Sequence, residues 1–453
     1  MKVSHEPNSC HILTGEYPPR PGGVSDHSFQ VAQGLASAGI SVHVWTSETG
    51  EPRNGGARFR EGEAPAEPTT RQTHQEVRPP GIMQADLDLE GVFVHRLNDP
   101  WSAAGLAEID RSLDGFPARN RLLVQYTPNA WGRKGLNFGF VRWLNSRVRR
   151  GDDVRPIVHE PWFRTEPWDR PWRYVLPPLQ RRMARELFSS SRLEVRGRER
   201  EGDAPAEPPS EFGSAGASPS RIHSTVSERK ITTVYVTIPH WERLLRPYAR
   251  SACFVNLPVP SNVPFVDDPE AVAEIRRRVT GDSSLVIGTF GTYREEIAPR
   301  LLEILPRVLN RADRVGLLIG RNGQAFAKTL PARASRVVAT GGLPPREVSL
   351  HLQACDVLIQ PYRDGVTARR GTLMAGLCQG KAIVTTSGKM SEPIWQVSGC
   401  VALAEDGDTP VFVSRVEELL ANPGLRRSLG EVARGIYVRE FALERTMEIL
   451  LRD

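Results

Sequence analysis

Residues 361–386 contain side chains suited to holding a phosphate. The segment reads PYRDGVTARRGTLMAGLCQGKAIVTT, in which the basic pair Arg369 and Arg370 directly precedes Gly371 and Thr372. Gly371 and Thr372 are expected to open a helix, and either can cap it. A helix start offers N–H groups and a positive dipole end to an anion, and arginines add fixed charge. The pattern predicts diphosphate binding, although a capped surface helix with two solvated arginines would have the same sequence.

A second phosphate-compatible pattern lies near the N-terminus, at residues 12–24, which read ILTGEYPPRPGGV. A predicted strand ends near Thr14, and a loop containing Glu16 leads through Gly22 and Gly23 into a helix. Glycines permit positive φ and close backbone approach. This loop could therefore meet a diphosphate or an acceptor hydroxyl, but a tight turn of any α/β protein would also fit.

His159 and Glu160 stand at the end of another predicted strand, in the segment IVHEPW. Parallel α/β sheets place functional groups at this edge. Gln125 and Tyr126 end a neighbouring strand and are expected near the same edge. A lone histidine there is as often simply packed, and for His240, after VYVTIP, we favour packing or a helix-start role.

The elements that must position these residues alternate between short apolar strands and helices, which predicts parallel sheets. A proline-studded segment, NLPVPSNVP, disfavours both helix and sheet and marks a linker at 256–266. We predict an N-terminal domain at 1–255 and a C-terminal domain at 267–453 with a helical tail from residue 410. The expected strands are 11–14, 40–46, 92–96, 121–126, 157–159 and 234–237, then 285–290, 315–319, 337–339, 357–360 and 382–385, with helices that include 25–38 and 295–309.

Two segments interrupt this alternation. Residues 60–68 read REGEAPAEP and residues 200–208 read REGDAPAEP, while the codons of GSAGASPSR at 213–221 can encode the same segment on the opposite strand. We infer a palindromic DNA insertion that is translated in frame. Its composition cannot bury a core, so we predict disordered insertions at 50–80 and 190–228.

Composition excludes several classes of protein. The 453 residues are 39% hydrophobic and 25% charged, and no stretch approaches the roughly 20 apolar residues that span a membrane. The five cysteines lack metal-ligand or disulfide spacing, which with the polar N-terminus predicts a cytoplasmic protein. A net charge of +6 favours anionic partners, including peripheral contact with the inner membrane surface, but the dispersed basic residues do not indicate nucleic acid.

The opening segment ILTGEYPPRPGGVSDHSFQVAQGLASAGISVHVWTS closely resembles the first strand, loop, helix and strand of glycosyltransferase family 4. The resemblance covers nearly the whole chain outside the two insertions. It implies an α/β protein with two Rossmann-like domains facing across a cleft, the GT-B fold. It also implies sugar transfer with retention from a nucleotide-diphosphate sugar, used as co-substrate without a tightly bound cofactor or metal. The acceptor would be a glycan, a lipid-linked molecule or a small molecule.

The resemblance also gives roles to individual residues. His159, with Glu160, would orient the donor sugar, and Glu16, Gly22 and Gly23 would line the acceptor side. The remaining residues would bind the donor: its phosphates through the basic residues, its base through the TGGLP loop, and its sugar through the acidic-glycine loop. These are Arg294, Arg321, Gly342, Leu343, Asp364, Gly365, Arg369, Arg370, Gly371 and Thr372.

The sequence departs from the family at two positions. Most members have two glutamates here, one at the sugar and one at the ribose, but alignment on Gly380 places Thr367 and Ala375 there. A non-catalytic nucleotide-sugar-binding protein of the same fold therefore remains an alternative, as does a sugar-nucleotide epimerase. A Rossmann dehydrogenase is disfavoured, because PPRPGGV lacks the G-x-G-x-x-G pattern.

Overall fold

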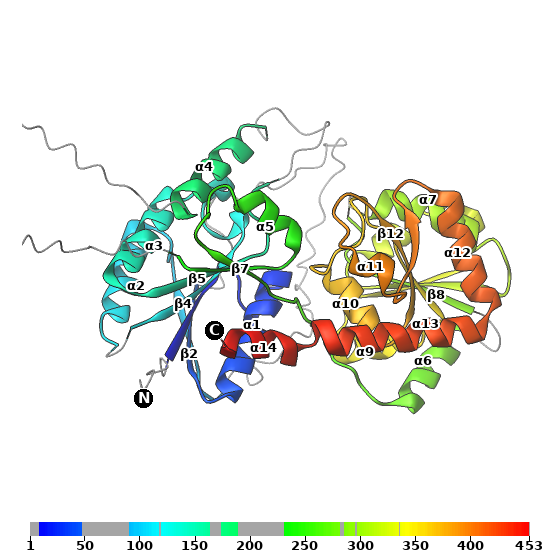
Figure 1. The fold of residues 1–453 in the computed structure, drawn as a ribbon. Coiled ribbons are helices and arrows are strands. Elements are labelled where there is room, and N and C mark those ends of the chain that lie inside the picture. Colours follow the sequence, from blue (N-terminus) through cyan, green and yellow to red (C-terminus); the bar gives the residue numbers. More distant parts are fainter. Residues whose placement is uncertain are drawn as a thin grey trace, which may run out of the picture.

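The computed structural model describes residues 9–47, 90–116, 119–163, 174–188, 231–280, 285–294, 297–334 and 336–452. They form two α/β units that lie side by side (Figure 1), each a parallel sheet with helices against it. The insertions predicted at 50–80 and 190–228 lie outside the described residues.

The first unit is built on a seven-stranded sheet in the order β3-β2-β1-β4-β5-β6-β7, in which every pairing is parallel. Its central strands are buried on both faces, which explains their continuous apolar runs. The strands are β1 (Ser9–Leu13), β2 (Ser41–Ser47), β3 (Val92–Leu97), β4 (Arg121–Tyr126), β5 (Asp153–Val158), β6 (Thr233–Val236) and β7 (Cys253–Asn256), and the helices are α1 (Gly23–Ser37), α2 (Ala103–Leu113), α3 (Phe138–Arg150), α4 (Leu176–Phe188) and α5 (Pro239–Leu245).

The expectation that residues 234–237 form the last strand of this half was wrong. Strand β7 follows and pairs with β6 along four residues. It is a short edge strand, with Cys253 and Asn256 exposed at its ends. An edge strand of this kind has little apolar signal, and Asn256, which we assigned to the linker, is its last residue.

The second unit has a six-stranded parallel sheet in the order β10-β9-β8-β11-β12-β13. The helix expected at 295–309 is α7, which is shorter and has prolines at both ends. The strands are β8 (Leu285–Phe290), β9 (Arg314–Ile319), β10 (Val337–Gly341), β11 (Val357–Gln360), β12 (Ala382–Ser387) and β13 (Ala402–Glu405), and the helices are α6 (Pro269–Thr280), α7 (Ala298–Val308), α8 (Gly323–Ala327), α9 (Pro345–Gln353), α10 (Gly371–Cys378) and α11 (Ile394–Val397).

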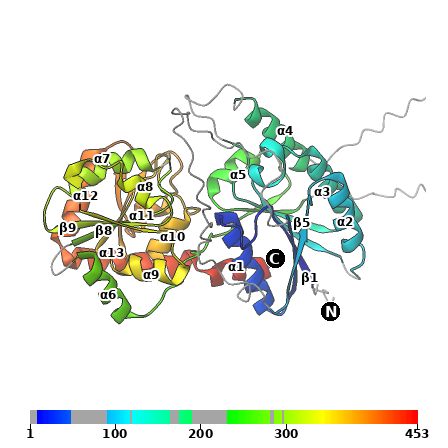
Figure 2. The ribbon, with the colours of Figure 1, turned by 180° about the vertical axis from the view of Figure 1, so that it is seen from behind.

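The C-terminal segment is helical, as predicted, and it crosses back to the first unit (Figures 1 and 2). Helices α12 (Thr409–Ala421) and α13 (Pro423–Ile436) lead through a π turn into α14 (Leu443–Arg452), which packs on α1. A Cβ at Gly34 of α1 would overlap the sulfur of Met447, so the two helices are in close contact. Thr446 Oγ1 also donates to the carbonyl of Pro258 at 3.0 Å. The predicted domain boundaries stay a prediction, but α14 lies on the N-terminal unit.

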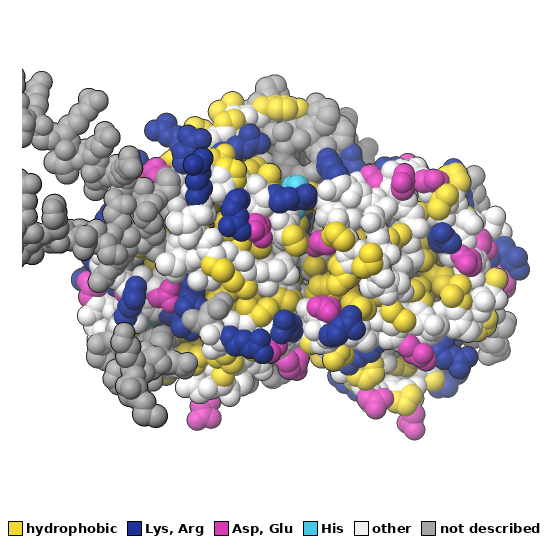
Figure 3. Space-filling model, in the orientation of Figure 1, with side chains coloured by type: hydrophobic (Ala, Val, Ile, Leu, Met, Phe, Trp, Pro, Cys, Tyr) yellow, Lys and Arg dark blue, Asp and Glu magenta, His cyan; other side chains and the backbone are white. Residues whose placement is uncertain are grey.

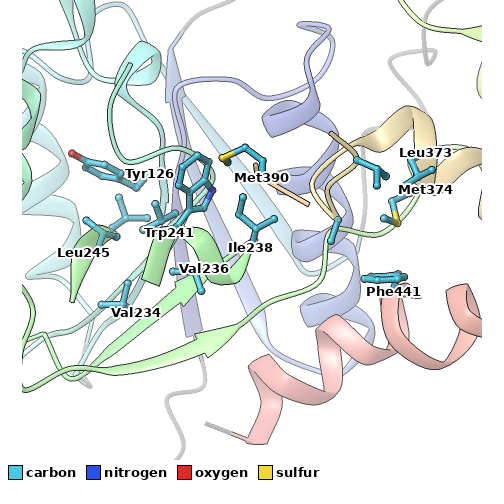
Figure 4. Close-up of a cluster of buried hydrophobic side chains, with 14 of the residues drawn as sticks. Tyr126, Val234, Val236, Ile238, Trp241, Leu245, Leu373, Met374, Met390 and Phe441 are labelled. Carbon is cyan, nitrogen blue, oxygen red and sulfur yellow. The ribbon is translucent and has the colours of Figure 1, made fainter. Parts of the chain in front are cut away.

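Buried apolar side chains continue from one unit into the other. Ile238 and Trp241 of the first unit belong to the same cluster as Leu373 and Met390 of the second (Figure 4). This shared cluster joins α5 of the first unit to α10 and the segment after β12 of the second. No helix among the described residues is both long and apolar enough to cross a membrane.

Candidate active site

The start of α10 is the feature of the second unit that is best suited to bind an anion. Arg370 is its N-cap residue, and its side chain makes no capping hydrogen bond. The expectation that Gly371 or Thr372 caps the helix was wrong, because both lie inside it and Thr372 Oγ1 instead shares a 2.7 Å hydrogen bond with the Tyr362 hydroxyl. The first-turn N–H groups of α10 therefore have no side-chain cap to compete with an anion.

The loop before α10 is fixed by close backbone packing. Gly365 has φ +87°, and a Cβ there would lie 2.3 Å from Gly388 N, so only glycine fits. The Asp364 carboxylate lies 3.4 Å from Lys389 Nζ. The Arg370 guanidinium stacks 4.8 Å from the centre of the Tyr362 ring. This loop thus holds the arginine pair beside the helix start.

The other predicted donor-binding residues follow strands β8, β9 and β10. Arg321 is exposed and lies along Gly342, where a Cβ would approach Arg321 Cγ at 3.1 Å. Leu343 packs against the shared apolar cluster. Arg294 is exposed, and its carbonyl accepts the N–H groups that begin α7. The structure therefore brings Arg321, Gly342 and Leu343 together and leaves the Arg294 side chain in solvent.

The N-terminal glycine pair begins α1 on the opposite side. Gly22 has φ 172°, which is extended backbone, and neither Gly22 nor Gly23 lies in the left-handed region, so the expectation that these glycines serve a positive φ was wrong. Gly22 lies close to the Glu16 carboxylate, because a Cβ there would lie 2.3 Å from Glu16 Oε2 and the end of that side chain would have to move. Gly23 is exposed with open space around it. Burial raises the pKa of Glu16, whose carboxylate therefore lies in a partly dry environment.

Asn262, from the linker, joins the starts of the two helices. Its Nδ2 donates to Asp26 Oδ2 of α1 at 2.6 Å, and its Oδ1 lies 4.0 Å from the Cβ position of Gly371 at the start of α10. Burial raises the pKa of Asp26, while Asn262 and the charge of Arg321 lower it. The starts of α1 and α10 thus face one region of the junction from the two units.

His159 follows β5 and forms a cluster with two buried polar side chains: Gln125, which was expected at the same edge of the sheet, and His27, which was not. Gln125 Oε1 lies 2.7 Å from His159 Nε2 and 3.2 Å from Nδ1 of His27 on α1. The two imidazole rings meet edge to face, 4.9 Å between centres. Burial lowers the pKa of His27 to about 4. Glu160, the next residue, is partly buried.

Arg369 of the second unit contacts the first unit close to this cluster. Its guanidinium lies 5.4 Å from the centre of the Trp241 ring of α5. Burial, His27 and the Arg369 charge all hold the pKa of His159 well below its usual range. The Trp241 indole N–H is buried and has no acceptor among the described residues. Arg369 therefore faces the N-terminal unit, whereas Arg370 stays on its own loop.

Glu392 is a further buried carboxylate close to this loop. Its Oε1 accepts the Ala368 N–H at 2.9 Å and its Oε2 accepts the Trp395 indole N–H at 2.6 Å. Burial raises its pKa. Thr367 and Ala375, which replace the two family glutamates, are only 1% and 0% exposed. Glu392 thus positions the backbone that carries Arg369.

Sequence reasoning missed four residues of this region: His27, Trp241, Asn262 and Glu392. His27 could have been found, because it lies four residues before the buried Val31 on the core-facing side of α1. A polar residue at such a position indicates a specific partner. The other three are brought in by tertiary packing and carry no local signal.

Comparison with known proteins gives a family for the second unit. Residues 283–422, which include the whole second sheet and α10, match the family described as Glycosyl transferases group 1. The second unit is a group 1 glycosyltransferase domain. The predicted family and the prediction of a transferase are thereby confirmed. No curated protein sequence matches the chain.

Solved structures give the same fold for the whole chain. WaaG, a glycosyltransferase involved in lipopolysaccharide biosynthesis, is 15% identical over 97% of this chain and 98% of its own, with a TM-score of 0.59. Sucrose-phosphate synthase from Thermosynechococcus elongatus is 11% identical over 98% and 97%, with a TM-score of 0.61. HepE of Anabaena, in complex with UDP and glucose, is 10% identical over 99% of each chain, with a TM-score of 0.62. The predicted two-domain GT-B fold is confirmed.

Proposed function

We propose that this glycosyltransferase moves a sugar from a nucleotide-diphosphate sugar to an acceptor hydroxyl with retention of configuration. The observation that carries the proposal is the uncapped start of α10, flanked by Arg369 and Arg370, within the group 1 domain. A helix start and two fixed cations suit the charge of a departing diphosphate.

In this reaction the bond between the sugar C1 and the diphosphate oxygen breaks, and a bond from C1 to the acceptor oxygen forms on the same face. The acceptor proton passes to the departing diphosphate, so no protein nucleophile is assigned. Positive groups that are already in place stabilise the developing charge without having to reorganise. No tightly bound cofactor or metal is part of the proposal.

The N-terminal unit is proposed to hold the acceptor and the donor sugar. The charge of Arg369 acts on His159 across the junction, while the Glu16 carboxylate lies close to Gly22 at the start of α1. The acceptor would be a glycan, a lipid-linked molecule or a small molecule. Basic side chains are spread over one face of both units with acidic ones among them (Figure 3), and the net charge of +6 favours peripheral contact with an acidic membrane surface in the cytoplasm.

The test is a panel of nucleotide-diphosphate sugars, with UDP-glucose first because UDP and glucose are bound in HepE. Calorimetric titration measures binding, and mass spectrometry with extracted glycans and lipids detects transfer. Arg370→Ala is the test variant, and Arg415→Ala, of an exposed arginine on α12, is the matched control. Transfer by the wild type and the control, with loss in Arg370→Ala, supports the proposal. Absence of binding across the panel contradicts it.

A second candidate is a non-catalytic nucleotide-sugar-binding protein. It is favoured by the buried, non-acidic Thr367 and Ala375 at the places of the family glutamates. Tight binding of a nucleotide sugar without transfer or hydrolysis, across the full panel, would select this candidate.

A further inference from the structure

The buried Gln125 holds two histidines through one oxygen atom. Its Oε1 lies 2.7 Å from His159 Nε2 and 3.2 Å from His27 Nδ1. Gln125 is 0% exposed and His27 is 1% exposed. A polar arrangement this deeply buried is costly unless its geometry is used. Nε2 of both Gln125 and His27 has no hydrogen-bond partner among the described residues, so packing stability alone does not account for the arrangement.

The chemistry of these contacts determines which nitrogens carry protons. With Oε1 of Gln125 facing both rings, His159 is protonated at Nε2 and His27 at Nδ1, because a carbonyl oxygen only accepts hydrogen bonds. A neutral imidazole has one protonated nitrogen, and the other is an acceptor. In neutral His159 the acceptor is therefore Nδ1.

The surroundings keep His159 in its neutral form. It is partly buried, and the groups that face it are His27 from α1 and the Arg369 guanidinium from the second unit. Burial is the largest effect and, with both neighbours, lowers the pKa of His159. Gln125 carries no charge, unlike the carboxylate that often partners a histidine, so no negative charge on that side favours imidazolium.

We propose that Gln125, backed by His27, is a positioning residue that fixes the ring and tautomer of His159, so that Nδ1 accepts a hydrogen bond from a hydroxyl of the bound substrate. The proposal rests on the proposed function and deepens it. It makes the site selective for a sugar that donates a hydroxyl at this point, and it assigns Gln125 no contact with the reacting atoms.

The first test needs no substrate. Nitrogen-15 NMR of the histidine rings in the full chain distinguishes the two neutral tautomers, and the His159 signals are assigned by their absence in His159→Gln. The expected result is neutral His159 protonated at Nε2 at pH 7. Protonation at Nδ1, or an imidazolium, would overturn the proposal. Because this reading does not depend on turnover, it remains informative if the proposed transferase activity fails.

The second test replaces Gln125, whose Oε1 contacts His159, and His27, which contacts the same oxygen. Gln125→Met keeps the volume but accepts only weakly, and losing one neutral hydrogen bond is expected to lower kcat/KM about fivefold. His27→Asn retains an N–H donor near the Nδ1 position, whereas His27→Phe does not. We expect kcat/KM to fall less in His27→Asn than in His27→Phe, and equal losses would contradict a positioning role.

The third test uses pH. In Gln125→Glu a carboxylate accepts from His159 Nε2, which favours imidazolium and raises the pKa of His159. Activity that needs the neutral ring must then fall as pH drops through the raised pKa, whereas the wild type keeps its activity at the same pH. A new acidic limb in the Gln125→Glu profile supports the proposal. Parallel profiles in folded protein, with the same thermal midpoint at each pH, would overturn it.

Discussion

Acid should destabilise this protein through His11, the residue at the centre of an aromatic cluster on the first sheet. His11 is 0% exposed, and its ring stacks on that of His43 with 5.2 Å between the ring centres. His43 Nδ1 in turn lies 3.0 Å from His95 Nε2. The Trp45 indole N–H donates to His11 Nδ1 at 3.3 Å, so that nitrogen is unprotonated. Burial, followed by the charge of His43, lowers the pKa of His11 from 6.5 to about 3.

The sign follows from proton uptake. Between pH 6.5 and about 3 the unfolded chain protonates His11 while the folded chain does not, so stability falls as pH decreases through this window. Each pH unit costs about 1.4 kcal/mol per such histidine. Between pH 7 and pH 5, the unfolded chain takes up the His11 proton mainly below pH 6.5. The free energy of unfolding therefore falls by on the order of 2 kcal/mol through His11.

Urea denaturation of the wild type and of His11→Phe, at pH 7 and pH 5, isolates this effect. Phenylalanine fills the aromatic site without titrating, and all other groups titrate in both proteins. The free energy of unfolding of the wild type should fall by about 2 kcal/mol more than that of the variant. An equal loss in the two proteins would show that His11 is not held neutral, and would refute the reasoning.

Three further predictions concern the second unit and the insertions. Gly365→Ala places a Cβ 2.3 Å from Gly388 N at a residue with φ +87°. We therefore expect the free energy of unfolding to fall by about 1–3 kcal/mol, seen as a lower thermal midpoint, and donor binding measured by calorimetry to weaken. Glu392→Gln can accept through only one side-chain atom, so one of two buried N–H donors loses its partner; urea denaturation should show a cost of about 1–3 kcal/mol. Deletion of residues 198–221, part of the predicted insertion, should leave soluble yield and activity unchanged.

The strands and the family could be read from the sequence because their signals are local. Buried parallel strands are continuous apolar runs, and β4, β8 and β11 begin and end where the pattern predicted. Strands β7 and β13 were missed because each has four residues, of which few are buried. The return of α14 to α1 was not predictable either, since it depends on the fit of Met447 at Gly34.

The residues of the candidate site also differ in whether their sequence order places them together. Gly365 and the arginine pair follow one strand and precede one helix, so their sequence order already places them together. The cluster of His27, Gln125 and His159 combines α1, β4 and β5, which meet only in the folded sheet. The glycine pair is a third case: it marked the start of α1 correctly, but Gly22 has extended backbone beside the Glu16 carboxylate and does not lie in the left-handed region.

The measurement that tests the central claim most directly is calorimetric titration of the wild type, Arg370→Ala and Arg415→Ala with the donor panel, followed by detection of transferred sugar. The α10 site predicts that wild type and Arg415→Ala bind a nucleotide-diphosphate sugar equally. Loss of charge-assisted hydrogen bonds to the diphosphate should weaken binding to Arg370→Ala by about ten- to a hundredfold. Equal donor affinity in all three proteins would contradict the assignment of this helix start.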